Sequence, residues 1–169
     1  MEETLDFNEK PKRPALITVL AILSWISSAF GGLQSLVNLI FHDARKYNAL
    51  QQLELAKEQF EEMRSNFMSK LIERTMNASI QMIENFFFLS NANNFLVSAL
   101  SALAVYWMFR LKRKGFILYS GVHLLGLIPL FYMNSVIESN TLMTFAVYVT
   151  VFFTVLFIGL YSIHLRKMN

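Results

Sequence analysis

The sequence predicts an all-α fold: a polytopic membrane protein whose four transmembrane helices pack as an antiparallel bundle. Four apolar runs of bilayer length fill most of the 169-residue chain. Hydrophobic residues make up 54% of the chain and charged residues only 16%, against about 25% charged in ordinary soluble domains. A helix needs about 20 mostly apolar residues to cross ~30 Å of hydrocarbon. The four runs therefore leave little room for a separate soluble domain.

The apolar runs divide the chain into four spans and the segments that join them. Short connections make neighbours in sequence neighbours in space, which favours the antiparallel bundle. The expected segments, in chain order, are a cytoplasmic tail (1–14), the first span (15–41), an extracytoplasmic amphipathic helical segment (42–85), the second span (86–109), a basic cytoplasmic turn (110–115), the third span (116–133), an outer loop (134–141), the fourth span (142–163) and a second cytoplasmic tail (164–169).

The distribution of basic residues predicts how the chain is threaded. Nine lysines and arginines lie in the two tails and in the turn after the second span, whereas segment 42–85 carries 6 basic and 7 acidic residues. The positive-inside rule then places both termini in the cytoplasm. The cluster in the turn is expected to anchor this topology or to bind anionic lipid headgroups; it consists of Arg110, Lys112, Arg113 and Lys114.

The first apolar run also has features of a signal peptide. Basic residues precede it, and Ser27-Ser28-Ala29 resembles a small-x-small cleavage site. The apolar stretch nevertheless continues to Phe41, which is longer than the apolar region of a signal peptide. We therefore expect an uncleaved first span.

One face of the first span carries only small residues. They recur at steps of i, i+3, i+4, i+7, i+8 and i+11, and they are Ser24, Ser27, Ser28, Gly31, Gly32 and Ser35. Helices associate in lipid chiefly by close van der Waals approach over small residues. This face is therefore predicted to be a helix-packing seam.

Polar side chains in the spans form a possible intramembrane polar site, which comprises Gln34, Asn38, Asn91, Asn94, Ser98 and His123. An amide in hydrocarbon is costly unless it is hydrogen-bonded, so the asparagines of the second span are expected to bridge to the polar end of the first. Two interpretations stay open: hydrogen bonds that join the helices, or a polar substrate pocket. His123 is a functional-site candidate because it is ionisable, and a neutral imidazole bonded to a neighbour is the alternative.

Segment 42–85 is predicted to be helical. No glycine or proline occurs between Gly32 and Gly115, and good helix formers dominate the segment. A break is expected near residues 65–66 or 77–79. Its apolar stripe needs to cover something: the other half of the same hairpin, the membrane surface or another protein. The possible partner-binding face consists of Phe60, Met63, Phe67 and Leu71.

Several function classes are excluded by what the sequence lacks. It has no cysteine, so it has neither disulfides nor thiolate metal sites. The three histidines lie at different depths, which leaves no metal or haem site, and no cofactor is expected. No catalytic motif is present, and nothing suggests nucleic-acid binding. No carboxylate lies inside a span, which argues against a proton-coupled exporter. We therefore expect a protein that is not an enzyme.

Two stretches resemble a known family. KPKRPALITVLAILSWISSAFGG at residues 10–32 and KRKGFILY at residues 112–119 resemble uncharacterised small four-span inner-membrane proteins of Bacteroidota. They cover about a fifth of the chain. The resemblance implies a location in a bacterial inner membrane, and it brings no activity and no functional residues.

The expected function follows from abundant packing surface without reactive groups. We expect a non-enzymatic accessory or scaffold subunit of a larger inner-membrane complex, which acts through helix packing and its extracytoplasmic helices. Its partners would be membrane lipids and other membrane protein subunits. The alternative is a small oligomeric channel or transporter with a polar path lined by the first three spans.

Overall fold

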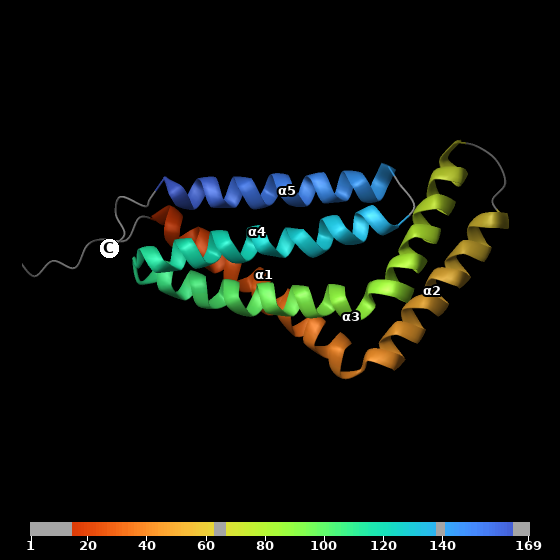
Figure 1. Cartoon of the computed structure of the whole chain (residues 1–169), viewed down its shortest axis with the longest axis horizontal. Helices are drawn as coiled ribbons and strands as arrows, with labels where there is room; N and C mark the ends of the chain where they lie inside the picture. Colours follow the sequence, from red (N-terminus) through yellow and green to blue (C-terminus); the bar gives the residue numbers. More distant parts are fainter. Residues whose placement is uncertain (1–14, 63–66, 138–140, 164–169) are drawn as a thin grey trace, which may run out of the picture.

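The computed structural model describes residues 15–62, 67–137 and 141–163, and this part of the chain is helical with short connections (Figure 1). Four of its helices are long and apolar enough to cross a membrane: α1, α3, α4 and α5. The prediction of an all-α protein with four such helices is confirmed. The helices are α1 (Ala15–Ile40), α2 (His42–Glu62), α3 (Phe67–Phe109), α4 (Arg113–Val136) and α5 (Thr141–Ser162).

Helix α3 differs from the expectation, whereas α1, α4 and α5 begin and end within three residues of the predicted spans. The predicted border at residues 85–86 is not a helix end, because α3 continues through it. Of the two expected breaks, residues 77–79 are helical and residues 65–66 lie outside the described residues. With 43 residues, α3 is about 65 Å long, roughly twice the thickness of a hydrocarbon core.

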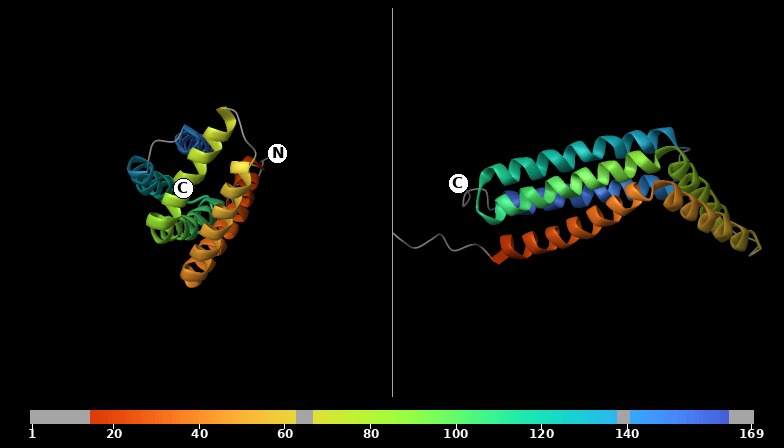
Figure 2. Two further views of the ribbon diagram at one scale, coloured as in Figure 1. Left: turned by 90° about the vertical axis from the view of Figure 1, so that its right-hand side faces the viewer. Right: turned by 90° about the horizontal axis from the view of Figure 1, so that it is seen from below.

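The extra length of α3 stands outside the helix bundle. Helices α1, α4 and α5 lie beside the second half of α3, whereas α2 and residues 67–85 form an arm that projects at an angle (Figure 1, Figure 2). We call the end of the bundle that carries the arm the elbow end. The opposite end, where α3 turns into α4, is the turn end.

The arm is a helical hairpin that folds on itself. Helix α2 packs against α3, which is the intramolecular arrangement that the apolar stripe allowed. At the elbow, the Lys46 ammonium donates a hydrogen bond to the carbonyl oxygen of Glu84 over 2.7 Å. The His42 ring lies edge-on to the Phe87 ring, with centroids 5.3 Å apart. These contacts tie the start of α2 to the middle of α3.

The turn end is closed by a tight link between α3 and α4. The Lys112 N–H donates to the carbonyl of Trp107 and the Leu111 N–H to that of Met108, which is the hydrogen-bond pattern of a Schellman motif. Leu111 takes the left-handed conformation (φ 58°) that glycine adopts most easily. The following glycine, Gly115, serves packing instead: a Cβ there would lie 2.6 Å from backbone atoms of α3.

The apolar core is split into two clusters at opposite ends of the bundle. The turn-end cluster draws on all four bundle helices and contains Ile17, Leu20, Ala21, Ala104, Val105, Met108, Tyr119 and Tyr161. The elbow-end cluster excludes α1 and contains Ala78, Phe86, Met133 and Ile137. The described buried residues between them include the polar side chains of Ser35, Asn91 and Ser101. Val122 is buried there as well, so the middle of the bundle is partly polar rather than wholly apolar.

We expect Gly115→Ala to destabilise the protein, because the backbone of α3 cannot move away from an added methyl group. Overpacking of this kind costs about 1–3 kcal/mol, to be measured as the free energy of unfolding in a denaturant titration of the detergent-solubilised protein. Gly121→Ala is the matched control, since nothing lies within 4 Å of its Cβ position. Equal stability of the two variants would contradict the close approach of α4 to α3.

Candidate functional site

The small-residue seam of α1 lies against α3 over part of its length. A Cβ at Gly32 would lie 3.1 Å from Ser98 Cβ, and one at Gly31 would lie 3.4 Å from Ser98 Oγ. Ser24 and Ser35 are buried, and Ser28 is half-buried. Ser27 is exposed. The two glycines therefore meet Ser98, while the Ser27 edge of the same face does not pack on a helix.

An amide bridge joins α1 to α3 near the elbow end. The Asn38 amide donates to Asn91 Oδ1 over 2.9 Å, and the Asn91 amide donates to the carbonyl of Phe87 over 2.7 Å. The sequence predicted a bridge between the polar ends of these helices, and this pair forms it. Gln34 and Asn94, which were expected at the same depth, have exposed side chains.

His123 of α4 contacts polar groups of the neighbouring helices. Its Nε2 lies 3.0 Å from Ser101 Oγ of α3, and its ring lies 4.3 Å from the Tyr119 ring. Tyr119 in turn contacts the Tyr161 ring of α5, whose hydroxyl lies 3.1 Å from Ser24 Oγ of α1. This chain of contacts links all four bundle helices. Within the described residues, His123 Nδ1 has no hydrogen-bond partner.

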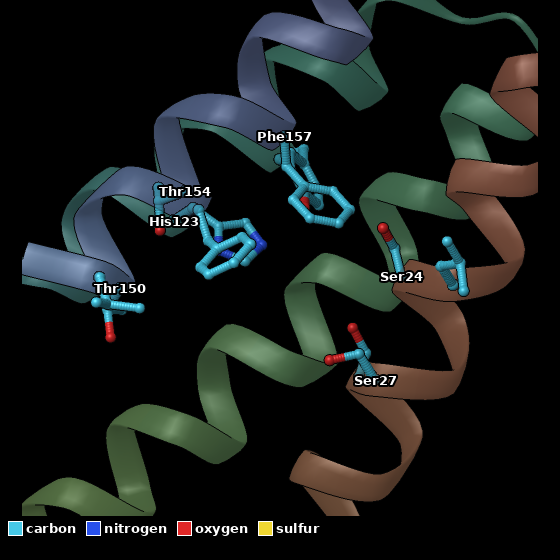
Figure 3. Close-up of a pocket in the computed structure, with 11 residues that line it drawn as sticks. Ser24, Ser27, His123, Thr150, Thr154 and Phe157 are labelled. Carbon is cyan, nitrogen blue, oxygen red and sulfur yellow. The ribbon is translucent and has the colours of Figure 1, made fainter. Parts of the chain in front are cut away.

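Three cavities share His123 in their lining, and we refer to them together as the central cavity. One, of about 380 Å³, lies between α1, α4 and α5; there Thr154 and Phe157 of α5 lie on the same side as the imidazole, and Ser27 of α1 lies opposite (Figure 3). A second, of about 240 Å³, lies between α3, α4 and α5. The third, of about 380 Å³, lies alongside the contact between α1 and α3 and is bordered by both helices and by His123. His123 is the residue that all three share.

Most of the predicted site residues line the third cavity. All six residues of the predicted polar site line it: Gln34, Asn38, Asn91, Asn94, Ser98 and His123. Four residues of the predicted seam line it as well: Ser27, Ser28, Gly31 and Ser35. The two stripes that were treated as separate features in the sequence therefore face one another across a shared polar space.

Sequence reasoning missed the contribution of α5. Thr150 and Thr154 line two of the three cavities, and neither was selected as a candidate. Their spacing of four residues places both on one face of the helix, and this spacing is the signal that was available. A threonine in an apolar helix commonly bonds back to its own backbone, as Thr150 does to the carbonyl of Ala146, which makes the signal weak.

The remaining predicted residues lie away from the central cavity. Arg110, Lys112, Arg113 and Lys114 are exposed at the turn end, and the Arg110 guanidinium lies 4.8 Å over the Tyr106 ring. On the arm, Phe60 is exposed and Leu71 is half-buried. Met63 lies outside the described residues, and Phe67 begins α3.

No metal centre accompanies these features in residues 15–62, 67–137 and 141–163, because no group of three or more histidine, aspartate or glutamate side chains gathers there. Comparisons with protein-family models, curated protein sequences and solved structures found no match. The site therefore has to be interpreted from its own chemistry.

We expect the Asn38–Asn91 bridge to contribute measurable coupling between α1 and α3. Interhelical hydrogen bonds in membranes contribute about 0.6 kcal/mol, and about 1.7 kcal/mol at most. A double-mutant cycle of Asn38→Leu and Asn91→Leu, read as free energies of unfolding, should give a coupling energy in this range. The control cycle pairs Asn38→Leu with Asn94→Leu, which should be additive. Additivity in both cycles would show that the Asn38–Asn91 bridge does not stabilise the packing of α1 on α3.

Proposed function

We propose that this protein is a non-enzymatic accessory or scaffold subunit of a larger complex in a bacterial inner membrane. The observation that carries the proposal is the arm. It holds α2 entirely and the first part of α3, and it leaves the bundle instead of covering it (Figure 2). A helical hairpin that projects from a membrane bundle presents a surface to something outside the chain.

The orientation of the subunit follows from charge. The turn end exposes the basic residues of the α3–α4 link, whereas α2 carries both acidic and basic residues. By the positive-inside rule the turn end and both termini lie in the cytoplasm, and the arm lies outside it. The four long helices then run as an antiparallel bundle. The resemblance to small Bacteroidota membrane proteins supports the inner membrane as the location.

The arm carries apolar side chains that its own hairpin leaves uncovered. Tyr47 is 66% exposed and Leu55 is 52% exposed, and their spacing of eight residues places them on one face of α2. Phe60, from the predicted partner face, is 39% exposed and lies on another side of α2, because it follows Leu55 by five residues. Exposed apolar groups on one face outside the hydrocarbon, such as Tyr47 and Leu55, mark an interaction surface. The partner is another membrane protein subunit that has an extracytoplasmic part, and lipids surround the bundle.

Purification from native membranes in mild detergent should recover a stoichiometric partner. The double variant Tyr47→Ser/Leu55→Ser should lose that partner while its amount in the membrane stays unchanged, because both side chains are exposed. Gln52→Ser/Gln59→Ser is the matched control, since both glutamines are exposed on the same helix, and it should retain the partner. Mass spectrometry of the eluates makes the measurement. A clean monomer from wild-type membranes at native expression would contradict the proposal.

One observation favours a second function, that of a small oligomeric channel or transporter. The cavity between α1 and α3 is lined by Gln34, Asn38, Asn91, Asn94 and His123. Uncharged hydrogen-bonding groups of this kind can replace part of the hydration shell of a polar solute. The path would be lined by α1, α3 and α4.

If the transport function holds, reconstituted proteoliposomes should show flux of a polar solute that Asn94→Leu and His123→Leu abolish. Leu124→Ile is the matched control, because Leu124 follows His123 on α4 and lines none of the three cavities. Absence of flux across several solutes would count against transport. Flux that survives both variants would place the path elsewhere.

A further inference from the structure

The central cavity is closed at the turn end. Ile17, Met108 and Tyr161 have no exposed surface there, and they belong to the apolar cluster that all four bundle helices share. A solute in the cavity therefore has no route past this cluster. Within one copy of the chain the space is therefore closed at this end, and a space closed at one end is suited to holding a ligand.

The pocket opens sideways, between α1 and α5. These two helices meet near the turn end through Ser24 and Tyr161, and over the described residues no extended contact joins them. The side chains of Leu23, Phe153 and Phe157 give this cavity an apolar lining, and Figure 3 shows Phe157 of α5 across from Ser24 of α1. An opening in the side of a membrane bundle faces lipid. The molecules that reach it directly are those dissolved in the bilayer.

The lining selects for a neutral head group on an apolar body. No aspartate, glutamate, lysine or arginine lines any of the three cavities. The polar groups are hydroxyls, amides and the His123 imidazole, which are neutral hydrogen-bonding partners. Exposed Leu23 and Phe153 give the cavity apolar walls beside these polar groups. A ligand that matches this lining has a neutral polar head and an apolar tail that stays in the lipid.

The depth of His123 narrows the class of head group. It is the eleventh residue of the 24-residue α4, about 15 Å from the start of the helix, which is the middle of a ~30 Å hydrocarbon core. A phosphate head would bury its charge without a cationic partner at this depth, because no lysine or arginine lines the cavities. A quinone ring has only two strongly accepting oxygens on a flat apolar ring, so it reaches this depth at little cost.

We propose that the central cavity binds the ring of an isoprenoid quinone that enters from the bilayer between α1 and α5. With Ser101 donating to His123 Nε2, the Nδ1 carries the proton and donates it in a hydrogen bond to one quinone oxygen. The Ser27 hydroxyl of α1, on the opposite side of the cavity (Figure 3), bonds the other quinone oxygen, and Thr154 lies beside the imidazole. A cavity of about 380 Å³ lies within the ~300–1,000 Å³ range of ligand pockets. The proposal concerns binding alone and does not depend on the partner of the arm.

Photoaffinity labelling tests the proposal with a defined probe. Wild-type protein in phospholipid nanodiscs is irradiated with an azido-quinone, and the labelled peptides are mapped by mass spectrometry. Label should concentrate on the peptides of α1 and α5 that flank the opening. Excess decylubiquinone should abolish the labelling, and excess diacylglycerol should leave it unchanged.

Two variants on α5 separate a specific pocket from general contact with lipid. Thr154→Phe fills the cavity and should reduce labelling about tenfold or more, equivalent to at least a tenfold weaker affinity. Val155→Phe adds the same ring at the next position, which is 57% exposed, and should label like the wild type. His123→Leu replaces the imidazole with an apolar side chain of similar size. It should also reduce labelling, because the hydrogen bond to the quinone oxygen is lost.

Three outcomes would overturn the proposal: labelling that decylubiquinone does not compete, equal competition by diacylglycerol, or full labelling of Thr154→Phe. Circular dichroism and thermal unfolding of each variant are recorded in the same nanodiscs. If Thr154→Phe fails to fold, His123→Leu and the competition experiment with wild-type protein still decide the outcome.

Discussion

A polar side chain inside a bilayer must find its hydrogen-bond partner within the protein, and the bundle is built around this constraint. The bridge from Asn38 to Asn91 joins α1 to α3, and the contact of Ser101 with His123 joins α3 to α4. The Ser24–Tyr161 contact joins α1 to α5. Apolar packing contributes mainly at the two ends, where the buried clusters lie.

The arrangement of the two bundle ends accounts for both proposed roles, ligand binding in the central cavity and partner binding by the arm. Because the turn-end cluster draws on every bundle helix, it fixes the helices there and lets α1 and α5 separate toward the elbow. The separation opens the central cavity to the side. At the elbow, Lys46 and His42 tie α2 to α3, so the arm leaves the bundle in a defined direction. The apolar cluster thus closes the turn end of the bundle, and the elbow end presents the surface of the arm.

Apolar run length predicted most of the fold. Three of the four predicted spans both begin and end within three residues of a helix. Hydrophobic length and helix length coincide where a charged or polar loop follows. They do not coincide in α3. Its apolar run begins near Phe86, yet no glycine or proline occurs between Gly32 and Gly115, so no helix breaker marks the border and α3 already runs from Phe67. Hydropathy locates the part of a helix that suits lipid, and it does not show how far the helix continues outside the lipid.

The candidate site was predictable in its residues and less so in its shape. Small and polar residues at helical spacing identified the facing stripes of α1 and α3. Periodicity alone could not show that Gly32 meets Ser98 while Ser27 borders a cavity, since that depends on the angle between two helices. Thr154 of α5 joined the site only through tertiary packing.

A polar cavity lies inside the bundle, and the exposed side chains of Gln34 and Asn94 give water a route into its α1–α3 part from the elbow end. Cysteine accessibility tests this directly. The chain contains no native cysteine, so a single Ser28→Cys or Phe30→Cys variant has no background. Ser28 lines the cavity, and Phe30 is 74% exposed on the outer surface of α1. A water-soluble thiol reagent should modify Ser28→Cys in membranes and leave Phe30→Cys unmodified. Equal reactivity of the two positions would contradict the cavity.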